Sequence, residues 1–154
     1  MFRHLTVLKE ETIEGLNIRP DGIYVDCTMG GAGHSESIAS RLDDRGLLIA
    51  VDQDEAALKA GAMRLAPYAD KVRIVRGNFR RLRELLASEP VPVRDGWPQV
   101  DGIVFDLGVS SPQLDEAERG FSYNQDAELD MRMDRSAPFS AKQLVNEWPE
   151  HKLA

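Results

Sequence analysis

Residues 23–35, IYVDCTMGGAGHS, carry the strongest indication of the fold, because an apolar run leads directly into a glycine-rich turn. Residues 23–27 have the β-branched, apolar character of a buried parallel strand. Gly30 and Gly31 end that run, and a helical pattern follows over residues 35–42. A strand, a glycine-rich turn and a helix in this order are typical of α/β domains that bind nucleotides.

The same alternation of apolar runs and helical patterns continues along the chain. It predicts strands over residues 47–51, 72–75 and 103–105, and helices over residues 6–16, 55–65 and 79–86. This order predicts a doubly wound parallel sheet with right-handed crossovers. Residues 88–98 hold three prolines and a glycine and are predicted as a surface loop, whereas residues 110–138 are polar and show no clear strand.

The composition is that of one globular domain. The 154 residues include 19 Lys+Arg and 26 Asp+Glu, which gives a net charge of −7. No run approaches the ~20 apolar residues of a membrane-spanning helix, and early charges argue against a signal peptide, so we expect a cytoplasmic protein without membrane association. The single cysteine, Cys27, cannot form an internal disulfide. The negative charge disfavours nucleic-acid binding through bulk electrostatics, although a local basic face is compatible with it.

Asp52 strengthens the interpretation of the turn as a nucleotide site. It ends the second predicted strand, 21 residues after Gly31, and should lie beside the turn at the carboxyl edge of the sheet. A carboxylate there can accept hydrogen bonds from both hydroxyls of a ribose. Two simpler explanations stay open: the turn uses glycine for backbone reasons alone, or Asp52 caps the next helix, a task for which Asp54 is better placed.

Motif spacing separates three nucleotide chemistries. A dinucleotide fingerprint that starts at Gly31 needs a small residue where this chain has Glu36. A phosphate-binding loop needs a lysine after its second glycine, but no lysine occurs between Lys9 and Lys59. NAD is therefore disfavoured and ATP bound through that motif is excluded, which leaves S-adenosylmethionine, an adenosine cofactor without a pyrophosphate. His34 shares no spacing with metal-binding carboxylates and is expected to start a helix near the cofactor.

Asp106 is the candidate for the chemical step. It ends the fourth predicted strand, which neighbours the first strand in the usual sheet order, and a carboxylate there can meet the methionine end of the cofactor or the attacking nucleophile. A role in capping or in a turn before Gly108 explains Asp106 equally well. Ser110 and Ser111 do not form the G-x-S-x-G motif of a hydrolase, and residues 126–137 lack the glycine and glutamate of a calcium loop. We expect no metal site.

Basic residues gather in two parts of the chain. The third predicted strand and the helix after it contain Arg73, Arg76, Arg80, Arg81 and Arg83. Charge on an exposed helix usually serves solvation alone. Arg119, beside Phe121 and Tyr123, is more suggestive, because guanidinium and aromatic planes hold unstacked RNA bases.

Longer motifs resemble a known family. They are IRPDGIYVD at 18–26, GAGHS at 31–35, VDQD at 51–54, FDLGVSSPQLD at 105–115, ERGFSY at 118–123 and LDMRMD at 129–134. Over nearly the whole chain the sequence is similar to the bacterial 16S rRNA (cytosine-N4)-methyltransferases of the MraW/RsmH type. The resemblance implies a Rossmann-like class I S-adenosylmethionine-dependent methyltransferase. Its substrate would be the exocyclic N4 of a decoding-centre cytidine in 16S rRNA of the small ribosomal subunit.

The resemblance also implies the site residues. The cofactor would contact Gly31, Ala32, Gly33, His34, Asp52, Phe79, Asp106 and Gln113. Of these, Phe79 and Gln113 rest on the resemblance alone, and Asp106 is the expected catalytic residue. The flipped base would be bound by Ser110, Ser111, Arg119, Phe121 and Tyr123.

Two segments follow from this comparison. Residues 1–109 are expected to form the cofactor-binding core with the first four strands, and residues 110–154 the substrate-binding segment and the start of a helical insertion. Family members are about twice as long, so we expect a sheet truncated after its fourth strand, whose exposed edge would support a homodimer. Two alternatives remain: a non-catalytic S-adenosylmethionine-binding module, and a structural or interaction domain without cofactor affinity.

Overall fold

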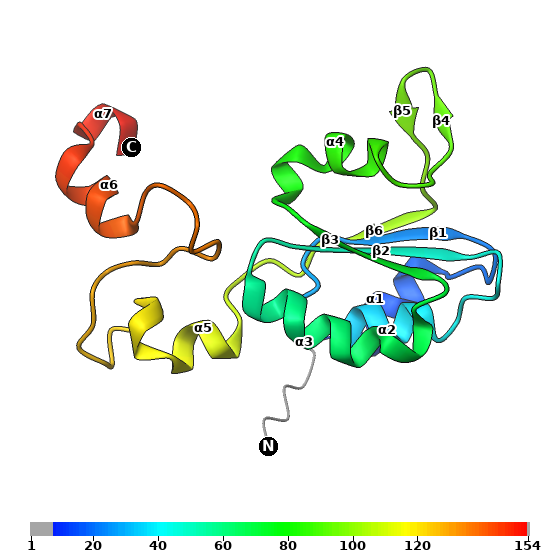
Figure 1. Ribbon diagram of the computed structural model, residues 1–154, viewed down its shortest axis with the longest axis horizontal. Coiled ribbons are helices and arrows are strands. Elements are labelled where there is room, and N and C mark those ends of the chain that lie inside the picture. Colours follow the sequence, from blue (N-terminus) through cyan, green and yellow to red (C-terminus); the bar gives the residue numbers. More distant parts are fainter. Residues whose placement is uncertain (1–7, 154) are drawn as a thin grey trace. The chain divides into compact units, whose positions relative to one another are not determined.

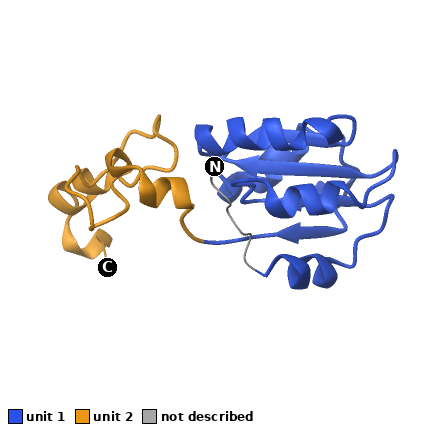
Figure 2. Cartoon of the chain, turned by 90° about the horizontal axis from the view of Figure 1, so that it is seen from below, with its two compact units in different colours: residues 1–107 blue, residues 108–154 orange. Residues whose placement is uncertain are grey.

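A parallel sheet of four strands forms the centre of the first of two compact units, Met1–Leu107 and Gly108–Ala154. The computed structural model describes residues 8–153 (Figure 1), and Figure 2 colours the two units separately. The strands are β1 (Ile23–Asp26), β2 (Leu47–Asp52), β3 (Val72–Arg76) and β6 (Gly102–Val104), in the spatial order β3-β2-β1-β6. The direction of winding therefore reverses between β1 and β6, which confirms the predicted doubly wound parallel sheet.

Helices cover both faces of this sheet (Figure 1). One face carries α1 (Lys9–Leu16), α2 (Gly33–Ala39), α3 (Glu55–Leu65) and the 3₁₀ turn η1 (Ala66–Tyr68), and the other carries η2 (Phe79–Arg81) and α4 (Leu82–Ala87). Neighbouring residues of a strand point to opposite faces, so Tyr24 and Leu48 pack under α1 to α3 while Val25 and Ile49 pack under α4. All four side chains are fully buried, and the sheet is thus the middle layer of an apolar core.

The predicted strands all exist, with ends that differ by one residue. The helix predicted over residues 55–65 has those bounds, because the Asp54 side chain caps it by accepting a hydrogen bond from Ala56 N at 3.0 Å. The helix predicted over residues 35–42 instead spans Gly33–Ala39, because its last turn tightens: Leu42 N donates to Ala39 O, three residues back. Residues 6 and 7 of the first predicted helix lie outside the described residues.

The predicted surface loop at residues 88–98 contains a small hairpin, so that prediction was wrong. Strands β4 (Val93–Arg94) and β5 (Trp97–Pro98) pair antiparallel around Asp95 and Gly96. Both turn residues have left-handed backbone angles, with φ of 52° and 76°. Asp-Gly is a preferred pair for such a two-residue turn. The sequence signal was present, but each strand is too short to show periodicity.

The second unit is built from short helices. They are α5 (Ser111–Asp115), η3 (Ala117–Arg119), α6 (Ala141–Glu147) and α7 (Glu150–Leu153), and the described residues from Gly108 onward form no strand. The sequence predicted an irregular segment here and missed α5. Its start is marked by Ser110, whose N–H donates to Gln113 Oε1 at 3.0 Å in a capping box. None of the described helices of the chain is long and apolar enough to cross a membrane.

Candidate functional site

The glycine-rich turn after β1 is fixed by hydrogen bonds to β2. Met29 N donates to Val51 O at 3.0 Å, and Gly30 N donates to Asp52 Oδ2 at 2.8 Å. Gly30 and Ala32 have left-handed φ angles of 50° and 60°, so the chain reverses tightly before α2. A Cβ added at the exposed Gly31 would meet no atom within 4 Å. The backbone of the turn therefore borders open space beside the carboxyl end of β2.

Asp52 links this turn to the start of α3. Its Oδ2 accepts from Gly30 N and its Oδ1 accepts from Asp54 N at 2.9 Å. The capping of α3 is done by Asp54, as the sequence favoured, so Asp52 is not the helix cap. A carboxylate oxygen has two lone pairs, and each Asp52 oxygen therefore keeps capacity to accept from a ligand hydroxyl. Asp52 combines a structural task with the geometry expected for a ribose acceptor.

Asp26 is a further part of the site that sequence reasoning missed. Its carboxylate is 1% exposed and accepts from Ser35 Oγ at 2.7 Å and from Thr28 N at 3.1 Å. These bonds tie the end of β1 to the first turn of α2, across the glycine-rich turn. Burial raises the pKa of Asp26 above its ordinary value. The available signal was an acidic residue that ends an apolar strand, with a small hydroxyl residue in the following helix.

His34 and Asp106 approach each other at the switch point between β1 and β6. Asp106 follows β6 and is exposed, and its backbone N–H donates to Thr28 Oγ1 at 2.7 Å. Its Oδ2 lies 3.8 Å from Nδ1 of His34, the second residue of α2, where the sequence predicted a helix-start histidine. His34 is 5% exposed, and its Nε2 has no hydrogen-bond partner among residues 8–153. A buried polar atom without a partner favours a ligand contact.

Two aromatic rings meet at the carboxyl ends of the strands. Phe79 follows β3 and Phe105 follows β6, the opposite edge strands of the sheet. Their ring centroids are 5.5 Å apart with an interplanar angle of 82°. The rings are 38% and 48% exposed, unusual for phenylalanine, and offer an apolar surface for a flat base. The first unit thus brings Phe79 to the same end of the sheet as Asp52 and Asp106.

The remaining predicted residues belong to the second unit. Gln113 is buried and holds Ser110 N, and Ser111 is the first residue of α5. Arg119 is 3% exposed, donates to the carbonyls of Arg132 and Met133 at 3.2 and 3.3 Å, and lies 5.9 Å from the centre of the Phe121 ring. These contacts give Arg119 a structural role that the sequence did not predict.

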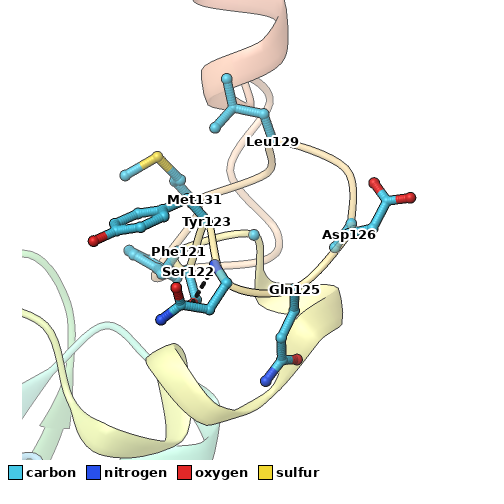
Figure 3. A pocket seen from close by; sticks show the side chains of 10 residues that line it. Phe121, Ser122, Tyr123, Gln125, Asp126, Leu129 and Met131 are labelled. Carbon is cyan, nitrogen blue, oxygen red and sulfur yellow. Dashed lines mark hydrogen bonds between the residues drawn. The ribbon is translucent and has the colours of Figure 1, made fainter.

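An open pocket of about 500 Å³ lies beside Arg119 in the second unit (Figure 3). Phe121, Tyr123 and Met131 line it and gather on one side of the close-up, and Tyr123 is 97% exposed. Gly120 is required at its base, because φ is 69° and an added Cβ would collide with the backbone of Glu128 and Asp130. The pocket therefore presents aromatic rings on a backbone whose path is tightly constrained.

The single thiol of the chain lies in the core. Cys27 is 2% exposed, and burial raises the pKa of its thiol to about 12, so the group is neutral and unreactive at neutral pH. Within the described part of the chain, no three His, Cys, Asp or Glu side chains are grouped to hold a metal ion.

The fold and the polar carboxyl edge define a Rossmann-like domain of the kind that binds a nucleotide-containing cofactor. The model of the MraW methylase family matches residues 1–154, and the chain belongs to this family, as the sequence motifs indicated. It is 62% identical over 154 residues to ribosomal RNA small subunit methyltransferase H of Paenibacillus sp. and 58% identical to the protein of that name from Brevibacillus brevis. The alignments cover 100% and 99% of this chain but 49% and 47% of the relatives. The chain thus spans about half the length of the curated relatives it matches.

A solved structure shows the same fold. The C-terminal domain of precorrin-6Y C5,15-methyltransferase from Rhodobacter capsulatus superposes with a TM-score of 0.53 at 16% sequence identity. The match covers 72% of this chain and 55% of that chain. At this identity the comparison concerns the fold alone.

Proposed function

We propose that this chain is the S-adenosylmethionine-binding part of a cytoplasmic enzyme that methylates the N4 of a decoding-centre cytidine in 16S rRNA. The observation that carries the proposal is the Asp52 carboxylate, which fixes the glycine-rich turn and keeps capacity to accept further hydrogen bonds. Family membership and the names of the relatives support the reaction and the class of substrate.

The residues at the carboxyl edge fit the cofactor. Asp52 would accept from the ribose hydroxyls, the Phe79 and Phe105 rings would flank the adenine, and His34 Nε2 would bond a polar group. Gly31, Ala32 and Gly33 would let the backbone approach closely. Bound S-adenosylmethionine supplies an electrophilic methyl group on its sulfonium sulfur.

Asp106 is the proposed catalytic residue. The lone pair of the cytosine N4 is delocalised into the ring, so the site must orient the amine and accept the proton that it loses. The Asp106 carboxylate is exposed and is positioned through its backbone bond to Thr28 Oγ1. It would accept a hydrogen bond from the amine and take up the proton as the N–C bond forms and the methyl group leaves the sulfonium sulfur, which keeps the electron pair of the broken S–C bond. His34, 3.8 Å away, would steady the carboxylate.

The second part of the proposal concerns residues 110–154, which would bind the substrate, while residues 1–109 bind the cofactor. Phe121 and Tyr123 present rings to the pocket in Figure 3 and would stack on the flipped base or its neighbours. Ser110 and Ser111 would contact the same nucleotide, and Arg119 would shape the pocket by holding nearby carbonyls. Gln113 is buried in the second unit, where it holds Ser110 N, and its proposed part in cofactor binding rests on the family resemblance alone. The outer edge of β6, unpaired among the described residues, is where a homodimer would form.

Calorimetric titration with S-adenosylmethionine tests the cofactor assignment. We expect the 154-residue chain to bind S-adenosylmethionine but not NAD, and Asp52→Ala to weaken binding by about tenfold or more, because a charged hydrogen bond contributes about 1.5–3 kcal/mol. Asp54→Asn is the matched control: asparagine also caps helices, so binding should persist. Unchanged affinity in a folded Asp52→Ala protein would contradict the assignment, and a folded wild-type chain that binds no cofactor would favour an interaction domain.

Transfer of a labelled methyl group to small ribosomal subunits tests the catalytic role. Asp106→Ala should abolish transfer, whereas Asp44→Ala, at an exposed aspartate of the turn before β2, should leave it unchanged. Normal transfer by Asp106→Ala would remove this carboxylate from the mechanism.

A further inference from the structure

Positive charge is concentrated in one segment of this acidic protein. Residues 72–98 contain six arginines and three acidic residues, a surplus of positive charge in a chain whose net charge is −7. The arginines are Arg73, Arg76, Arg80, Arg81, Arg83 and Arg94. Such a local surplus of positive charge within one domain is typical of a surface that binds a polyanion.

The fold brings much of this segment together on one face of the sheet. The helix α4 and the β4–β5 hairpin lie on the same side of the sheet, opposite the layer of α1, α2 and α3 (Figure 1). Arg83 connects the two: its Nη2 donates to Gly96 O at 3.0 Å, and its guanidinium lies 4.2 Å from the centre of the Trp97 ring. The hairpin is thereby attached to α4 and presents a stacked arginine–tryptophan pair.

Three groups on this surface are available to a ligand. Trp97 is 57% exposed although it is a large apolar residue. The Arg80 side chain is exposed and has no ion pair or hydrogen bond within residues 8–153, and the Arg94 side chain is 82% exposed with one long contact, 3.8 Å, to Asp95. By contrast, Arg81 is neutralised by Glu84 at 2.5 Å. The exposed Arg80 and Arg94 side chains are thus available to meet anions.

We propose that η2, α4 and the β4–β5 hairpin form a platform that binds a single-stranded stretch of the RNA substrate, at nucleotides other than the methylated one. The proposal rests on the RNA methyltransferase function proposed above and adds a second contact region. Arg80 and Arg94 would bind phosphates, and a base would stack on the Trp97–Arg83 pair, a combination typical of single-strand binding. An acidic protein partner would use the arginines but would have less use for an exposed ring stacked on a guanidinium.

The hairpin part of the platform is separate from the cofactor residues, whereas η2 begins with Phe79, a proposed cofactor residue. The hairpin leads into the amino end of β6, where Asp101 N donates to Ile23 O at the start of β1. Asp52 and Asp106 lie at the opposite, carboxyl end of the sheet. Substitutions in the hairpin, at Arg94 and Trp97, should therefore change RNA binding and leave the affinity for S-adenosylmethionine unchanged.

The test is fluorescence anisotropy with a labelled single-stranded RNA of about 20 nucleotides, long enough for a typical single-strand site, titrated at several salt concentrations. Arg80→Ala and Arg94→Ala should each reduce the slope of log K against log salt by about one. Trp97→Ala should weaken binding by about tenfold, and Trp97→Phe, which keeps an aromatic ring, should restore part of it. Arg41→Ala, an exposed arginine after α2 on the opposite face, is the matched control and should bind as the wild type does.

Each outcome decides the proposal separately from the cofactor assignment. If the folded Arg80→Ala and Arg94→Ala proteins bind RNA with the affinity and the salt slope of the wild type, the platform proposal is wrong, whatever the calorimetry with S-adenosylmethionine shows. Binding of a polyglutamate peptide that depends on Arg80 and Arg94 but not on Trp97 would assign the surface to an acidic protein and would also overturn it. Failure of the wild-type chain to bind S-adenosylmethionine would count against the proposed function but not against RNA binding by the platform.

Discussion

The two units of this protein are stabilised in different ways. In the first unit the sheet lies between two apolar clusters, and every buried apolar side chain of the described residues falls between Ile13 and Val104. In the second unit the described residues with buried side chains are polar: Gln113 and Arg119. The first, apolar unit therefore carries its proposed cofactor residues on a packed core and fixes them with hydrogen bonds at its carboxyl edge. The second, polar unit fixes its proposed RNA residues through hydrogen bonds without such a core.

The polar unit depends on two arginines. Arg132 makes two hydrogen bonds to the Asp130 carboxylate, at 2.7 and 2.9 Å, and a third to Ala137 O at 3.0 Å. Arg119 holds the carbonyls of Arg132 and Met133. The motif LDMRMD therefore has a structural explanation, because its charged residues close the loop that carries the pocket of Figure 3.

The largest expected effect comes from removing apolar volume from the two units in turn. Ile49→Ala, in the fully buried centre of β2, should lower the free energy of unfolding by about 2–5 kcal/mol. Leu129→Ala, at a residue 43% exposed in the second unit, should cost below about 1 kcal/mol. Urea denaturation measures both, and equal costs would contradict the contrast between the units.

A smaller effect is expected from removing a buried cation. Arg119→Ala should destabilise the loop around residues 129–137 by about 1–3 kcal/mol, because two carbonyls lose a charged donor. Arg135→Ala is the control, since Arg135 makes an exposed ion pair with Glu118. The rate of amide hydrogen exchange in residues 129–137 measures this destabilisation. Exchange in Arg119→Ala that is as slow as in the wild type would show that Arg119 does not hold the loop.

The smallest effect is a difference in pH dependence between Asp26 and Asp130. Burial raises the pKa of Asp26, so the folded chain keeps a proton that the unfolded chain loses, and this group's contribution to stability falls as pH rises from 3.8 through the raised value. The hydrogen bond from Arg132 lowers the pKa of Asp130, so its contribution is present above pH 3.8 and is lost as pH falls through the lowered value. The two carboxylates should therefore contribute to the pH dependence of stability with opposite signs.

Urea denaturation of Asp26→Asn and Asp130→Asn across the acidic range measures this difference. Relative to the wild type, Asp26→Asn should become more stable as pH rises, because asparagine cannot ionise in the core. Asp130→Asn should become less stable, because it lacks the charge that pairs with Arg132. If the stability of both variants, relative to the wild type, changes in the same direction as pH rises, then burial and ion pairing do not give the two carboxylates opposite pH dependence.

The sequence predicted those elements whose cause is local. Apolar runs located the four strands, and Asp54 marked the start of α3. The hairpin was missed because two-residue strands have no periodicity, and α5 because its Ser110–Gln113 capping box stands in a polar segment. These errors concern short elements that depend on turn chemistry.

For the site, spacing along the chain indicated the glycine-rich turn, Asp52 and Asp106. Other features were not predictable because they join distant residues: the meeting of Phe79 with Phe105, and the bond from Asp106 N to Thr28 Oγ1. Phe79 was predicted as a cofactor residue from the family resemblance alone. The structural role of Arg119 was missed because burial of a cation depends on contacts with residues 132 and 133.

The central claim is that the apolar unit carries a preformed cofactor site. The most direct measurement is a titration of the ¹⁵N-labelled chain with S-adenosylmethionine, followed by the amide signals in NMR spectra. We predict shifts at the turn and at the carboxyl edge, in Gly31, Ala32, Gly33, His34, Asp52 and Phe79, with no change at Leu48 in the core. Shifts confined to residues 108–153, or none in a folded chain, would contradict the claim.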